Sequence, residues 1–214
     1  MNRRTALTAF AAAAAFAAAP AWAQTEINVL DGADRAAGIA QANRALNSFQ
    51  RLQGRFTQTA PGGGRATGAI YLQRPGKLRF EYDPPNPLLI VSDGSVVAMR
   101  DPELRTTERT PLRSTPLALI LGERIDLERQ ARVTRVSRAG PWLMVTMRDR
   151  GGQTDGEITI QFYGDEAELR SWDVRDATGA RTRITLSDVS FPASLDRSLF
   201  RLEDMLERNR PGRR

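Results

Sequence analysis

The chain offers few side chains that could do chemistry. Its 214 residues include no histidine and no cysteine, which excludes a Ser-His-Asp triad, a histidine general base and the usual catalytic zinc sites. The carboxylates of Glu81, Asp93 and Asp155 could in principle act in pairs, as in glycoside hydrolysis. Their sequence neighbours, however, are turns and the polar side of a strand. We therefore predict that the protein is not an enzyme and uses no cofactor or metal ion.

The first 23 residues have the composition of an export signal. Arg3 and Arg4 precede an alanine-rich apolar run over 6–19, and an Ala-Trp-Ala triplet ends at Ala23. The apolar run is shorter than the roughly 20 residues that cross a bilayer. We predict a signal peptide over 1–23, exported by the general or the twin-arginine route, and a mature chain in the periplasm. Because cysteine is absent there is no lipobox, so the protein is not itself a lipoprotein.

The charge pattern does not favour a nucleic-acid partner. Lysine and arginine number 31 against 25 acidic residues, but the arginines are dispersed and alternate with acids, and Lys77 is the only lysine. The predicted export of the chain also argues against a nucleic-acid partner. We expect one monomeric domain over 24–214 with a sizeable core. Its basic tail, from about residue 203, is expected to be a solvated or frayed chain end.

Most of the chain has the patterns of short antiparallel strands. Helical spacing of apolar residues predicts one helix between Asp31 and Phe49. Period-two alternation then predicts many strands separated by Gly, Pro and Asp turns, and Pro116 opens a short apolar helix that Gly122 ends. The predicted class is α+β, mostly antiparallel β. Two modest helices give so large a sheet little cover, so we expect a concave apolar surface that suits a ligand cavity.

The strand expected over 77–82 has an apolar side and a polar side. Its alternating residues are Leu78, Phe80 and Tyr82 on the first and Lys77, Arg79 and Glu81 on the second. Taken alone, the apolar stripe is either closed core or the wall of a cavity. Taken alone, Arg74 is a solvated arginine at the end of the preceding strand.

The segment from Leu72 to Pro102, "LQRPGKLRFEYDPPNPLLIVSDGSVVAMRDP", resembles the signature of the LolA-like family of periplasmic outer-membrane lipoprotein carriers. The ordered features are Arg-Pro, a strand of alternating bulky residues, a proline loop, an apolar strand, Asp-Gly and a final Asp-Pro. Phe56-Thr57-Gln58 resembles the family's first strand, and "TPLALILG" resembles its mid-chain helix. The resemblance covers residues 35–125 well and the rest by pattern.

That resemblance implies a fold, a function and partners. The fold would be an open, curved half-barrel whose helices form a lid over a hydrophobic cavity. The cavity would hold the acyl chains of lipoproteins, accepted from an inner-membrane ABC-type transporter and delivered to an outer-membrane acceptor. From the strand and lid patterns we expect the acyl chains to contact Phe56, Ile70, Leu72, Leu78, Phe80, Tyr82, Ile90, Met99, Leu117, Ile120 and Met144. The alternatives are a periplasmic regulator that senses lipid or lipoprotein with the same half-barrel, and a carrier of free lipids.

The resemblance also gives Arg74 a role, because it occupies the position of an arginine that hydrogen-bonds the lid backbone in the closed, empty form. Pro75 biases Arg74 toward an extended backbone. Its guanidinium is a fork of donors that can bind more than one carbonyl. Uncharged acyl chains need area without directional bonds, and each buried CH₂ is worth about 0.8 kcal/mol. A chain without catalytic groups is what such a carrier requires.

Overall fold

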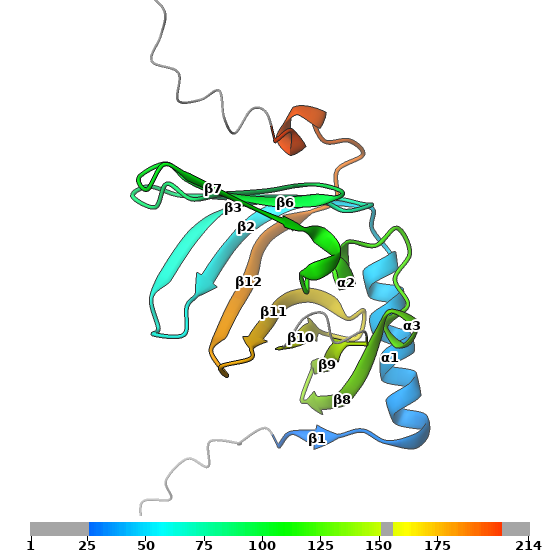
Figure 1. Cartoon of the computed structure of the whole chain (residues 1–214). Helices are drawn as coiled ribbons and strands as arrows, with labels where there is room; N and C mark the ends of the chain where they lie inside the picture. Colours follow the sequence, from blue (N-terminus) through cyan, green and yellow to red (C-terminus); the bar gives the residue numbers. More distant parts are fainter. Residues whose placement is uncertain (1–25, 151–155, 203–214) are drawn as a thin grey trace, which may run out of the picture.

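The computed structural model describes residues 26–150 and 156–202, which form one twelve-stranded sheet with short helices (Figure 1). The predicted signal peptide, Asp155 and the tail from residue 203 lie outside the described residues. The strands are β1 (Asn28–Val29), β2 (Arg51–Thr59), β3 (Arg65–Gln73), β4 (Lys77–Tyr82), β5 (Leu89–Asp93), β6 (Val96–Asp101), β7 (Thr106–Pro111), β8 (Ala131–Ala139), β9 (Trp142–Asp149), β10 (Gly156–Tyr163), β11 (Glu168–Asp176) and β12 (Arg181–Ser190). The helices are α1 (Gly32–Asn47), η1 (Leu112–Ser114), α2 (Ala118–Leu121), α3 (Leu127–Gln130) and η2 (Arg197–Phe200).

The sheet is antiparallel and open. Its strand order is β1-β8-β9-β10-β11-β12-β2-β3-β4-β5-β6-β7, and the β12–β2 pairing joins the two halves of the sequence. Over residues 26–150 and 156–202, β1 and β7 end the order and do not pair with each other. This confirms the predicted fold class, a mostly antiparallel, open sheet with few helices. None of the helices in these two ranges is long and apolar enough to span a membrane.

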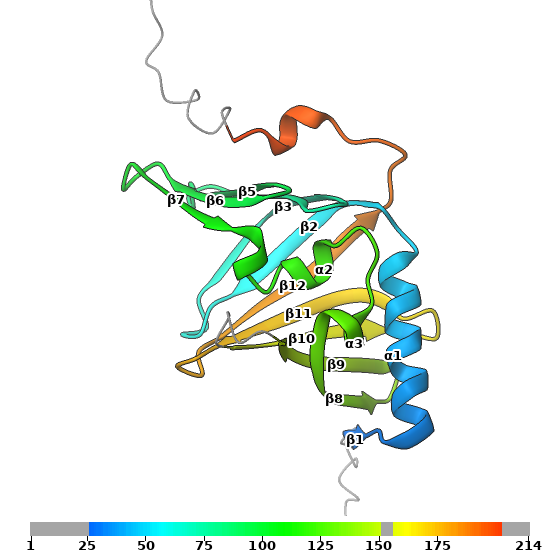
Figure 2. The same ribbon diagram turned by 45° about the vertical axis from the view of Figure 1, so that its right-hand side comes forward.

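The sheet curls around α2, while α1 runs along one side (Figures 1 and 2). In Figure 1 strands β5–β7 lie above α2 and strands β8–β11 lie below it, with β12, β2 and β3 connecting the two parts. We call the side of the sheet that faces α1 and α2 the concave face. The short apolar helix predicted after Pro116 is therefore present as α2, inside the curl of the sheet.

The core fills the concave face. One cluster of buried apolar side chains joins α1, α2 and the strands, and includes Leu46, Leu78 and Ile120. Aromatic rings hold the β2–β4 part together, since the Phe56 ring packs edge-on against those of Phe80 and Tyr82 at 4.9 and 5.0 Å between centroids. In this closed form the apolar stripe of β4 is buried core.

The opposite face of β4–β6 is covered by η2 and Leu202. The sequence pattern predicts that this polar side of β4 faces solvent. Arg79 is only 5% exposed; it donates to Glu81 Oε2 at 2.9 Å and to the Leu199 carbonyl at 3.3 Å. Leu202 forms a small apolar cluster with Val91 of β5 and Ala98 of β6. The prediction that Arg79 lies on a solvated face was wrong, because η2 and Leu202 pack there (Figure 1).

Candidate functional site: the lid and its arginine

Arg74 lies in the turn between β3 and β4 and points into the protein, where it is 5% exposed. Its backbone N–H donates to the Gln50 carbonyl at 2.9 Å. Its Nη1 donates to the Phe49 carbonyl at 2.8 Å and also to the Leu46 carbonyl. Its Nε and Nη2 both donate to the Ile120 carbonyl, at 3.2 and 3.0 Å. One guanidinium therefore bridges the end of α1 and the short helix α2.

These acceptors are available because helix ends leave carbonyls without intrahelical partners. Leu46 is in the last turn of α1, Phe49 follows that helix, and Ile120 is in the last turn of α2. The negative end of each helix dipole also favours a cation there. The sequence around Arg74 thus brings one fork of donors to two helix C-termini at once.

The turn that contains Arg74 also binds α2 through its backbone. The N–H of Gly76 donates to the Leu121 carbonyl at 2.7 Å. Gly76 has φ +73°, and a Cβ at this position would lie 2.6 Å from the Cα of Gly94. A side chain would therefore push the turn away from both Gly94 and the lid. We use "lid" for residues 112–124, that is η1, α2 and the links around them.

Arg74 is charged in an almost dry environment. Burial lowers the pKa of its guanidinium to about 10, so the group remains protonated at neutral pH. Its cation lies over the Phe49 ring at 4.5 Å from the centroid, which is a favourable cation–π distance. Carbonyl dipoles and this ring take the place of water around the charge.

Most of the residues predicted to contact acyl chains meet in the one buried cluster of the concave face. The buried members are Phe56, Ile70, Leu72, Leu78, Phe80, Tyr82 and Ile120. Ile90 and Leu117 are partly buried and pack against the same cluster. Tyr82 keeps its hydroxyl satisfied by donating to Gln58 Oε1 at 2.6 Å, and burial raises the pKa of this phenol to about 12.

The two predicted methionines are outside the buried cluster. Met99 is directly opposite Ile90 on the neighbouring strand, so it lies on the same face of the sheet, but it is 38% exposed, near the edge strand β7. Met144 lies on the face of β9 opposite to Leu143 and Val145, where it lines a polar hollow with Thr146. Met144 therefore lies on the other face of β9 from the buried cluster, and the methionine of β9 that faces the core is Met147.

The sequence reasoning missed half of the apolar concave face. Its residues on β8–β12 are Val136, Leu143, Val145, Met147, Ile158, Ile160, Phe162, Trp172, Ile184 and Leu186. The sequence signal for them is clearest on β10, where Ile158, Ile160 and Phe162 alternate with Thr159, Gln161 and Tyr163. Trp172 joins this half to the other, with its ring centroid 6.3 Å from that of Phe80.

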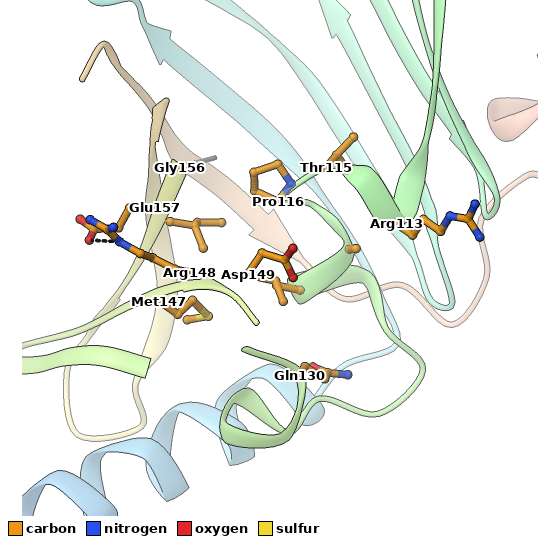
Figure 3. Close-up of a pocket in the computed structure, with 12 residues that line it drawn as sticks. Arg113, Thr115, Pro116, Gln130, Met147, Arg148, Asp149, Gly156 and Glu157 are labelled. Atoms are coloured by element: carbon orange, nitrogen blue, oxygen red, sulfur yellow. Dashed lines mark hydrogen bonds and ion pairs between the residues drawn. The ribbon is translucent and has the colours of Figure 1, made fainter. Parts of the chain in front are cut away.

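A small pocket opens where the lid meets the ends of β9 and β10. Figure 3 shows Thr115 and Pro116 of the lid facing this strand pair. The pocket measures about 250 Å³, and its wall includes Met147. Arg148 and Glu157 line it too and form an ion pair at 3.4 Å. It lies beside the buried cluster, to which its lining residues Met147 and Ile158 belong.

The comparisons with known proteins give a consistent result. The family model described as "Outer membrane lipoprotein carrier protein LolA" matches residues 47–203. An outer-membrane lipoprotein carrier protein of Dechloromonas aromatica is 30% identical over 176 residues, which cover 78% of this chain and 83% of that relative. A protein of the same name from Chromobacterium violaceum is 30% identical over 175 residues, covering 78% and 83%.

Among solved structures, the LolA superfamily protein NE2245 from Nitrosomonas europaea is similar with a TM-score of 0.46 and 10% identity, over 79% of this chain and 98% of that one. The sequence matches carry the assignment, because they extend from the end of α1 to residue 203 and include both the Arg-Pro turn and the lid. The resemblance seen in the sequence is confirmed, and the chain belongs to the family of the outer membrane lipoprotein carrier protein LolA.

Proposed function

We propose that the protein is a periplasmic carrier that binds the acyl chains of lipoproteins against its concave face and moves them from the inner to the outer membrane. The names of its relatives support this role. The observation that carries it is the bridge made by Arg74, which ties the short helix α2 to the C-terminal end of α1 over an apolar concave face.

The closed form has little room for cargo. The pocket between the lid and the ends of β9 and β10 measures about 250 Å³, below the roughly 300–1,000 Å³ of ordinary small-molecule sites. A more open hollow of about 430 Å³ also borders the lid, but turns, lid residues and the end of β7 line it rather than the buried strand residues of the concave face. Ile120 and Leu121 of the lid fill the concave face and are almost fully buried. Acyl chains would have to displace these side chains, so we propose that loading requires the lid to swing out.

Opening the lid would break few polar contacts. The bonds from Nε and Nη2 of Arg74 to Ile120, and the bond from Gly76 to Leu121, join the turn to the lid. The bonds from Arg74 to Leu46 and Phe49 join it to α1 and can remain in place. The guanidinium would thus stay held and charged while its other donors await the lid. We call the contacts to Ile120 and Leu121 the latch.

The proposed partners follow from this role. The cargo is an acylated lipoprotein, the donor is an inner-membrane ABC-type transporter, and the acceptor is at the outer membrane. The protein would act as a monomer after removal of the signal peptide, and it would act as a carrier rather than as an enzyme. Dispersion and burial of apolar area, rather than directional bonds, would hold the acyl chains.

Site-specific photocrosslinking in cells tests the proposal. A photoreactive phenylalanine analogue at Phe80, on the concave face, should capture acylated protein, which mass spectrometry identifies by its lipid-modified N-terminal peptide. The matched control is Tyr71, an aromatic residue on β3 whose neighbours Ile70 and Leu72 face the core while it faces the other way. Capture at Tyr71 alone, or at neither position during active lipoprotein traffic, would mean that the concave face is simply a packed core. Capture of a membrane regulator would favour the sensor, and capture of free lipid alone would favour a lipid carrier.

A further inference from the structure

Two asparagines of α1 hold the chain just beyond the lid. Asn47 accepts from the Ile125 N–H at 2.9 Å and donates to the Ile125 carbonyl at 2.8 Å. One turn earlier in the helix, Asn43 accepts from the Leu127 N–H at 3.0 Å. The amide of Asn47 also donates to the Asn43 carbonyl at 2.7 Å, which fixes its orientation.

These contacts reproduce a short piece of backbone pairing. Asn47 offers Ile125 one donor and one acceptor, as a neighbouring strand would, and the spacing of four residues puts both asparagines on one face of α1. The side chains of Ile125 and Leu127 are buried in the core cluster, at 2% and 0% exposure. Between them and α2, Glu123 and Arg124 are exposed. The firm contact with α1 therefore begins at Ile125.

The other end of the lid is also held. The N–H of Leu112 donates to the Ser95 carbonyl at 2.8 Å, and the preceding residue, Pro111, is in register with Val96 on the sheet. Only residues 113–124 lie between the two attachments. In the middle of this span, Arg74 and Gly76 hold Ile120 and Leu121.

We propose that Asn43 and Asn47 are positioning residues which keep the far end of the lid fixed on α1 while the latch opens and closes. The inference rests on the proposed carrier function. The lid is then a strap attached at both ends, and Arg74 is its releasable contact in the middle. Leu46 and Phe49, whose carbonyls hold Arg74 on α1, belong to the same end of that helix as Asn47. A strap fixed at Asn47 therefore stays close to the guanidinium even when the latch is open. Reclosing is intramolecular over a short loop, which keeps its entropic cost low.

Hydrogen exchange on the empty protein tests the attachment without any cargo. In Arg74→Leu we expect faster exchange of the amides of the lid helix, with the amides of Ile125 and Leu127 unchanged. In the double variant Asn43→Ala/Asn47→Ala we expect the Ile125 and Leu127 amides to exchange at least about tenfold faster, the effect of losing one to two net hydrogen bonds.

The matched control is Gln41→Leu on the same helix. Gln41 donates to the Asp165 carbonyl at 2.7 Å and so joins α1 to the turn before β11 rather than to the lid. Its loss should change neither set of amides. A milder variant, Asn47→Asp, serves if the double variant folds poorly. It keeps the acceptor for the Ile125 N–H and loses the donor to the Ile125 carbonyl, so the Ile125 amide should exchange at a rate between those of the wild type and the double variant.

Two results would overturn the inference. One is wild-type protection of Ile125 and Leu127 in the asparagine variants. The other is equal loosening of 125–127 and of the lid helix in Arg74→Leu, because the far end would then move with the lid. A cargo experiment gives a separate readout: loss of the attachment and loss of the latch should slow lipoprotein transfer non-additively, since both act on one closure step. Failure to find any cargo would end the carrier proposal, yet the exchange result on the empty protein would still stand.

Discussion

Replacing Arg74 by leucine removes the fork of donors and keeps an apolar side chain in the space of its stem. The lid loses the charged donors that reach Ile120, at 3.0 and 3.2 Å. A hydrogen bond to a charged group contributes about 1.5–3 kcal/mol, which converts to a shift of about tenfold to 150-fold in the ratio of open to closed lid. The variant should therefore fold and still accept lipoprotein, because opening becomes easier.

Release should suffer instead. In the proposed mechanism, the departure of cargo is coupled to recovery of the latch bonds, and without them the empty closed form is less favourable. The assay is the rate at which purified, cargo-loaded protein transfers lipoprotein to acceptor membranes. Arg74→Leu should transfer far more slowly, and Arg74→Lys should be only partly active because it has the charge without the fork.

The matched control is Arg109→Leu, because Arg109 is an exposed arginine on the edge strand β7. It should transfer as the wild type does. If Arg74→Leu also transfers at the wild-type rate, the latch reasoning is wrong, however many hydrogen bonds the side chain makes in the closed form.

Two further predictions concern stability. Gly68→Ala places a Cβ against the backbone carbonyl oxygen of Glu81 and 2.5 Å from Cε1 of Phe56, and such overpacking should lower the free energy of unfolding by about 1–3 kcal/mol in urea; an unchanged midpoint would show that both the β4 backbone and the ring can move aside at little cost. Burial alone would raise the pKa of Asp173, but hydrogen bonds and charge from Arg183 and Arg181 outweigh it and hold the pKa of this carboxyl below its usual range. The ionised carboxylate therefore stabilises the fold fully above about pH 4, and this contribution is lost as the pH falls through the lower pKa of the folded state. In Asp173→Asn the free energy of unfolding should fall less steeply with decreasing pH than in the wild type. Equal slopes of unfolding free energy against pH in the two proteins would contradict this.

The sequence predicted what local pattern and turn chemistry determine. The alternation over 77–82 correctly placed Leu78 and Phe80 toward the core, and Pro116 marked the lid helix. It could not predict the environment of Arg79, because the carbonyl that covers it belongs to Leu199, 120 residues away. Contacts of that range leave no trace in a window of a few residues.

Two other misses have local causes. Both faces of β9 carry large apolar side chains, Met144 on one and Met147 on the other, so alternation alone could not say which faces the core; the packing of β9 against α1 decides it. Strand β7 has six exposed residues, "TTERTP". It pairs with β6 only through its backbone, and a strand with no buried side chain gives no hydrophobic signal.

In the proposed carrier, the energies of the lid would allow cargo to be released at the outer membrane without an external energy source. Burial of Ile120 and Leu121 contributes about 1.5–3 kcal/mol each, and the Arg74 contact adds about 1.5–3 kcal/mol. Closing the empty protein therefore recovers on the order of 5–9 kcal/mol, against roughly 12 kcal/mol for burying one sixteen-carbon acyl chain. The two states differ by only a few kcal/mol, because the lid side chains and the cargo compete for the same apolar surface. A larger difference in favour of cargo would trap it, and a difference in favour of the closed lid would prevent loading. The difference is about 3–7 kcal/mol on these figures, and the roughly 1.5–3 kcal/mol of the Arg74 contact is a sizeable part of it. In the proposed carrier, loss of this one guanidinium would therefore shift the balance toward bound cargo.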